Sequence, residues 1–214
     1  MSILLEALER CLRVLEYKHS HIIQDLKPGL SIEEIENITN SLLYKIPKEI
    51  KELYQWRNGM NFGGIFYSPY SNTLLFNSLD KAVEKSFQLT GLEKYKVEED
   101  NQIEELHLFN SIDRWYPFAA WQELDKTAIF TITDDSYLRI PYTSLTNMVL
   151  AHAECYENEL FTFRCSGYVG REVHLEEGDD TKREFLSVVN KYNLLEDKNY
   201  IFNQYNIDIE NRVL

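Results

Sequence analysis

Residues 65–76, IFYSPYSNTLLF, decide the fold class of this 214-residue chain. Two short β-rich runs, 65–67 and 73–76, are separated by Ser, Pro and Asn, which favour turns. Before this stretch, apolar residues recur every three or four positions, as in an amphipathic helix. The stripe of the first helix consists of Leu4, Leu8, Cys11, Leu12 and Leu15. The sequence therefore changes from helices to strands at this point.

Two more helices are predicted before residue 60. Ser31 can cap one of them, while Glu34, three residues later, reaches back to the Ser31 backbone. Pro47 fits the first position of the next helix, where its missing N–H is harmless. Gly59 follows Asn58 and suits the left-handed residue that closes this helix.

After residue 76 both kinds of spacing occur without a regular order. We expect helices at 79–89 and 145–156, an edge strand at 115–119 with its proline near the start, and paired strands at 128–133 and 137–140. Because strands do not alternate regularly with helices, the predicted class is α+β. We expect an antiparallel mixed sheet with helices packed on one side.

Several short motifs in this order resemble those of the SUKH superfamily. That family contains the fungal SMI/KNR cell-wall-synthesis regulators and many bacterial immunity proteins. The motifs are LKPGLSIEEI at 26–35, IPKEIKELY at 46–54, WRNG at 56–59, LDKA at 79–82 and WYPFA at 115–119. The resemblance implies a SUKH-like domain over residues 1–163. Residues 164–214 have no counterpart in it, and we expect them to form a C-terminal extension packed on the same domain.

The chain also departs from the family pattern, because Glu123-Leu124-Asp125-Lys126 replaces the Gly-Asp pair that usually follows the last motif. The motif residues themselves are interpreted as structural, since large aromatics dominate cores and function must be argued from the surface. These residues are Pro28, Gly29, Pro47, Trp56, Asn58, Gly59, Trp115 and Pro117.

The charge is strongly acidic and unevenly distributed. The chain has 22 basic and 35 acidic residues and a formal net charge of −13. Residues 1–60 carry 8 basic and 9 acidic groups, whereas residues 61–214 carry 14 and 26. Such a chain is repelled by phosphate backbones but steers a basic protein toward it. The alternative explanation for these acidic residues is a solvated surface or, at 134–135, a β-turn. The candidate partner-binding residues are Tyr95, Glu98, Glu99, Asp100, Asp134, Asp135, Glu176, Glu177, Asp179 and Asp180.

Signals for catalysis are weak. No Gly-rich phosphate loop and no Ser, Cys or His motif of known spacing is present. His152 and Cys155 would share one helical face and are the weak metal candidates, with Cys165 and His174 as further ligands of zinc. No CxxC pair supports that reading, so we expect no cofactor and no enzyme. A Cys155–Cys165 disulfide is an alternative use of these thiols.

An odd, sparse set of three cysteines and the lack of a long apolar segment predict a cytoplasmic protein without membrane contact. The resemblance then implies a module that binds and neutralises a basic bacterial toxin, for example a nuclease. The alternatives are a regulatory interaction protein of the SMI/KNR type and, less favoured, a metal-dependent enzyme. Nucleic acid is not an expected partner.

Overall fold

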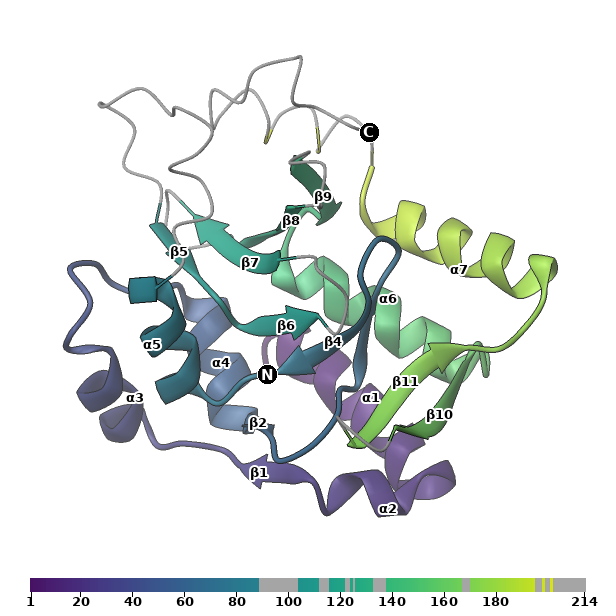
Figure 1. The fold of residues 1–214 in the computed structure, drawn as a ribbon, viewed down its shortest axis with the longest axis horizontal. Coiled ribbons are helices and arrows are strands. Elements are labelled where there is room, and N and C mark those ends of the chain that lie inside the picture. Colours follow the sequence, from purple (N-terminus) through teal and green to yellow (C-terminus); the bar gives the residue numbers. More distant parts are fainter. Residues whose placement is uncertain are drawn as a thin grey trace.

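The computed structural model describes residues 1–88, 104–111, 116–121, 124, 126–132, 138–166, 170–194, 198 and 201 (Figure 1). Antiparallel sheets and helices are both present, which confirms the α+β class. The helices are α1 (Ile3–Lys18), α2 (Ser20–Ile23), α3 (Ile32–Thr39), α4 (Lys48–Trp56), α5 (Leu79–Gln88), α6 (Leu145–Glu157) and α7 (Asp179–Tyr192).

The strands of the described residues pair into four small sheets rather than one. Their members are β1 (Leu26–Pro28) and β2 (Arg57–Met60); β3 (Phe66–Ser68), β4 (Asn72–Phe76) and β6 (Phe109–Ser111); β5 (Glu104–Leu106), β7 (Tyr116–Trp121), β8 (Ala128–Ile132) and β9 (Leu138–Tyr142); and β10 (Phe161–Ser166) and β11 (Gly170–Leu175). The expected single sheet is divided between β6 and β7: β6 bonds to β4, whereas β7 bonds to β5 and β8.

The helical layer is built around α6. In Figure 1, α1 and α6 lie behind the strands, and α7 lies beside α6. The apolar stripe of α1 is buried as its spacing predicts, and Ser2 caps this helix by accepting a hydrogen bond from the Leu5 N–H. The Ser31–Glu34 capping box at the start of α3 is also confirmed, with both hydrogen bonds present.

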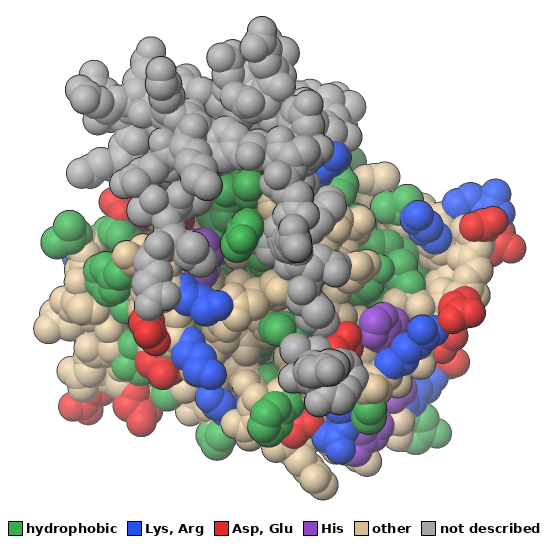
Figure 2. Space-filling view, in the orientation of Figure 1, with side chains coloured by type: hydrophobic (Ala, Val, Ile, Leu, Met, Phe, Trp, Pro, Cys, Tyr) green, Lys and Arg blue, Asp and Glu red, His purple; other side chains and the backbone are tan. Residues whose placement is uncertain are grey.

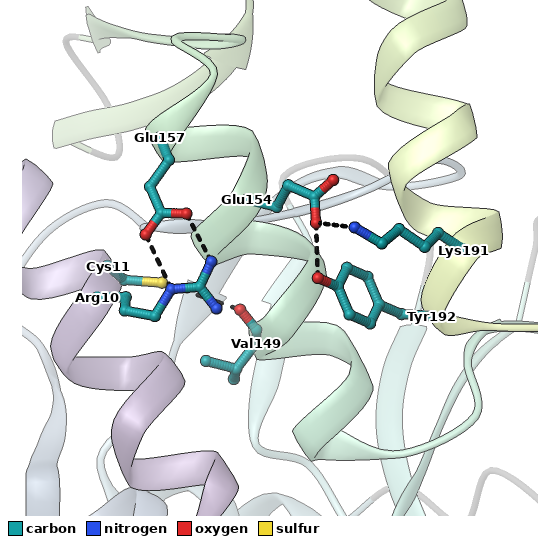
Figure 3. Close-up of polar contacts among 7 residues, drawn as sticks. All are labelled: Arg10, Cys11, Val149, Glu154, Glu157, Lys191 and Tyr192. Carbon is teal, nitrogen blue, oxygen red and sulfur yellow. Dashed lines mark hydrogen bonds and ion pairs between the residues drawn. The ribbon is translucent and has the colours of Figure 1, made fainter.

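Polar contacts fasten α6 to both neighbouring helices (Figure 3). On one side, the Arg10 guanidinium of α1 donates two hydrogen bonds to the Glu157 carboxylate, at 2.8 and 2.5 Å. On the other side, Lys191 and Tyr192 of α7 both donate to Glu154, at 2.7 and 2.6 Å. The Lys191 hydrogen bond, with that of Tyr192, lowers the pKa of the Glu154 carboxyl.

The outer edge of β3 is covered by side chains instead of by another strand. The Tyr67 N–H donates to His152 Nε2 (2.6 Å), and the Tyr67 carbonyl accepts from the Tyr142 hydroxyl (2.5 Å). The neighbouring Ile65 carbonyl accepts from the Tyr156 hydroxyl (2.6 Å). Side chains from α6 and β9 thus satisfy backbone groups that an edge strand otherwise leaves open.

Three local expectations need correction. Helix α4 begins at Lys48, so Pro47 occupies the N-cap and its carbonyl accepts from the Lys51 N–H. Gly59 has a left-handed φ of +78° but lies inside β2, not at a helix end. Glycine is also required there because a Cβ would lie 2.6 Å from the Asn77 carbonyl carbon. The close approach of the Asn77 backbone, rather than the end of a helix, therefore explains this glycine.

The third correction concerns the strand predicted at an edge. Residues 119–121 of β7 pair with β5 on one side, and β7 pairs with β8 on the other. Only the start of β7, where Pro117 pairs with Thr131, lacks a described partner on the β5 side. The missing N–H of proline is tolerated there because no ladder bond is required at that position.

The C-terminal part shares the core of the rest. Strand β10 spans residues 163 and 164, where the SUKH-like domain was expected to end. Phe161, before this point, and Phe185 and Val189, after it, belong to the same buried apolar cluster as α1 and α4.

Candidate functional site

Four of the predicted partner-binding residues lie together where β11 runs into α7. Glu176, Glu177, Asp179 and Asp180 are all exposed, and we call them the acidic junction. Figure 2 shows Asp and Glu side chains at this edge of the molecule, with Lys and Arg side chains among them. The other candidates, Tyr95, Glu98, Glu99, Asp100, Asp134 and Asp135, lie outside the described residues, as does Trp115.

The acidic junction is held by the hairpin that precedes it. Gly63 and Gly64 allow β11 to approach the central strands, since a Cβ at Gly63 would lie 1.7 Å from the Arg171 carbonyl oxygen. The Gly64 N–H donates to that oxygen (3.0 Å), and its carbonyl accepts from the Val173 N–H (3.2 Å). At the far end, the Glu176 N–H donates to the Leu160 carbonyl. Backbone hydrogen bonds therefore hold the strand that leads into the junction and Glu176 at its start.

Helix α7 positions the other half of the junction. Phe185, Val188 and Val189 bury one face of α7 in the core, whereas Asp179 and Asp180 at its N-terminal end are exposed. Asp179 and Asp180 fall in the first turn, where negative side chains interact favourably with the helix dipole. Their acidity is thus compatible with the local fold and adds no cost to it.

Charge pairing at the junction is partial. Glu177 accepts from Arg164 at 2.7 Å, and Asp180 pairs with Arg183 one turn along the helix. Within the described part of the chain, neither Glu176 nor Asp179 has an ion-pair partner. Exposed pairs contribute about 0–1 kcal/mol, so a partner can exchange them at little cost. The junction can offer up to four carboxylates to a basic surface.

The metal candidate His152 is a core residue. Its Nε2 accepts from the Tyr67 N–H, so its Nδ1 carries the proton and donates to the Met148 carbonyl at 2.7 Å. Burial lowers the pKa of His152 to about 4, against the raising effect of its backbone hydrogen bonds. Both ring nitrogens are already bound to backbone, which leaves no lone pair for a metal ion.

Cys155 and Cys165, the predicted thiol ligands, do not form a metal site with His152. Burial raises the pKa of Cys155 to about 12, which opposes the thiolate form that binds zinc. Cys165 is exposed on β10, and all three cysteines are free, so the Cys155–Cys165 disulfide is not formed. His174 pairs with Glu172 at 3.4 Å. In the described parts of the chain, no group of three or more His, Cys, Asp or Glu residues is placed to hold a metal.

The motif residues that the structure describes join elements to one another. Trp56 ends α4, and its Nε1–H donates to Glu9 of α1 at 3.1 Å. Asn58 Oδ1 accepts from the Leu79 N–H at 2.8 Å and so caps α5. Pro28 of β1 pairs with Arg57 of β2. Gly29, the next residue, packs against the backbone at the C-terminal end of α4.

Sequence reasoning missed the buried carboxylate of Glu49. It accepts hydrogen bonds from the N–H groups of Thr127 (2.8 Å) and Thr146 (3.0 Å) and from the Thr146 hydroxyl. Burial raises the pKa of Glu49, while these hydrogen bonds oppose the shift. The available signal was spacing, because Glu49 shares the i, i+4, i+7 face with Leu53 and Trp56. It links α4 to the start of α6.

Comparison with known proteins adds no family: no protein-family model matches the chain, and no curated protein matches it. Among the described residues, no helix combines the length and apolar character that crossing a membrane requires.

Proposed function

We propose that this chain is a non-catalytic protein-binding module of the cytoplasm, an immunity protein that neutralises a cognate bacterial toxin with a basic surface. The observation that carries the proposal is the acidic junction, in which exposed carboxylates are displayed from a fixed hairpin and the first turn of α7. The SUKH-like motifs of residues 26–119 support the immunity role, and the free cysteines support a reducing compartment.

Charge complementarity explains how such a module would act. A nuclease toxin must hold phosphates and therefore presents Lys and Arg at its active surface. Carboxylates placed over those cations exclude the nucleic acid and accelerate association through long-range attraction. The neutralising step needs no catalysis by the immunity protein.

The test is binding to the purified product of the neighbouring gene, measured by calorimetry. We compare Glu176→Lys/Asp179→Lys with the control Glu6→Lys/Glu16→Lys. Both pairs are exposed, and both include one residue of a first helical turn. They change the net charge equally. At roughly 1.4 kcal/mol per reversed contact, the junction variant should bind about 100-fold more weakly, whereas the control should stay within about threefold.

The proposal fails if the neighbouring product does not bind at micromolar concentration, or if both variants weaken binding equally. Binding to a cellular protein that is not a toxin would instead favour the regulatory SMI/KNR-type role.

A further inference from the structure

The loop between α3 and α4 is anchored on both sides of one exposed leucine. Ile46 is buried in the core, and the Tyr44 hydroxyl donates to the Glu105 carbonyl at 2.6 Å. The Tyr44 ring also packs edge-on against Trp121, with ring centroids 5.5 Å apart. The Leu42 N–H is bonded to the Thr39 carbonyl. Leu43, between these anchors, is nevertheless fully exposed.

A groove of about 430 Å³ opens beside Leu43. Its volume lies within the range of protein ligand sites, roughly 300–1,000 Å³. The loop between α3 and α4, which are both labelled in Figure 1, supplies most of its lining, and the two helices supply the rest. The described lining residues are Glu36, Thr39, Asn40, Leu42, Leu43, Tyr44, Lys45, Ile46 and Lys51.

The groove is basic although the chain is acidic. Neither Lys45 nor Lys51 has an ion pair among the described residues, and Glu36 is the one acidic residue in the described lining. Burial, with Glu104 and Glu105, raises the pKa of Tyr44. The Glu105 carbonyl binds the Tyr44 hydroxyl, so these acids lie at the end of the ring that faces β5. With no ion pair among the described residues, Lys45 and Lys51 can meet external carboxylates.

We propose that this groove binds an acidic peptide segment of a partner protein. A large apolar side chain of that segment packs on Leu43 and Leu42, while flanking carboxylates pair with Lys45 and Lys51. A buried apolar anchor with surrounding polar contacts is the usual pattern of energetic hot spots. This surface is separate from the acidic junction. It requires an acidic partner segment, whereas the junction requires a basic one.

The experiment selects binders from a displayed library of random 12-residue peptides on the full-length protein. We expect enrichment of peptides in which Leu, Phe or Trp is flanked by Asp or Glu. The most enriched peptide is then synthesised, labelled, and titrated by fluorescence anisotropy. The groove variant is Leu43→Ser/Lys45→Glu. The control, Leu194→Ser/Lys182→Glu, makes the same chemical changes at exposed positions elsewhere.

The groove variant should bind the peptide at least about tenfold more weakly, as expected for losing roughly 1.4 kcal/mol from one apolar and one charged contact. The control should change binding less than about twofold. Leu43 contributes no buried surface, so the groove variant should keep the wild-type thermal unfolding midpoint. The proposal is overturned by basic or neutral consensus peptides, by no enrichment, or by equal weakening in the control.

Discussion

Helices α6 and α7 lie side by side and have nearly equal lengths, 13 and 14 residues, but they serve the fold in different ways. Helix α6 buries side chains around most of its surface, including the polar His152 and Tyr156. Helix α7 buries Phe185, Val188 and Val189 and presents its remaining side chains wholly or partly to solvent. One helix is fixed by the contacts of its whole circumference, the other by a single face.

This difference separates the residues that hold the fold from those that can meet a partner. A substitution at His152 or Tyr156 of α6 removes a hydrogen bond to the backbone of Tyr67 or Ile65 and also disturbs the core. A substitution on the outer face of α7 meets only water and neighbouring charges. Side chains on the outer face of α7 can therefore change without a comparable loss of stability.

The largest effect should come from Tyr156→Ala. This change leaves a cavity in the core and removes the hydrogen bond to the Ile65 carbonyl. We expect a loss of about 4 kcal/mol in the free energy of unfolding. The matched change on the neighbouring helix, Tyr192→Ala, removes a half-buried ring and should cost about 1 kcal/mol. Guanidinium unfolding measures both, and equal losses would abolish the distinction between the two helices.

His152 should give α6 a pH signature. The neutral ring is bound in the folded state, where its pKa is about 4, against about 6.5 in the unfolded chain. Above pH 6.5 both states are unprotonated and the group has no effect. Between pH 6.5 and 4 the unfolded chain binds a proton that the folded protein does not, so stability falls by about 3 kcal/mol.

Urea unfolding of wild type and His152→Gln from pH 7.5 to 4 isolates this contribution. The variant should be less stable at pH 7.5, and its stability should depend less on pH across the window. Parallel pH profiles would show that His152 is not held neutral by the fold.

The smallest effect concerns the ion pair that joins α1 to α6. Arg10 and Glu157 are partly exposed, with side-chain exposures of 24% and 41%. A double-mutant cycle with Arg10→Ala and Glu157→Ala should give a coupling of about 0.5–1 kcal/mol. The coupling should shrink in 1 M NaCl, where the Debye length is about 3 Å. A larger, salt-independent value would mean that polar contacts, rather than buried apolar surface, hold α6 in place.

Sequence patterns predicted the features that depend on nearby residues. The stripe of α1 and the Ser31–Glu34 box are set by contacts within one or two helical turns, so spacing alone reveals them. The helix expected at 79–89 is present as α5, but Phe87, which continues the helical spacing of Leu79 and Val83, is 63% exposed. Spacing places a residue on a face without showing how far the neighbouring layer extends.

Contacts between distant residues could not be predicted in this way. The Asn58 cap of α5 joins residues 21 positions apart, and the Glu49 contacts span 78 and 97 positions. The acidic junction was visible as a run of charge, but its support by Gly63 and Gly64 depends on the docking of β11. The groove beside Leu43 likewise exists only once α3 and α4 are packed.

The covered edge of β3 also affects how copies of this protein behave toward one another. An open strand edge is a template on which a second chain can add a strand, and repeated addition leads to fibres. His152, Tyr142 and Tyr156 occupy that template with groups that cannot propagate it. The same three side chains that contribute to the core thus also block this edge against pairing with a strand of another copy.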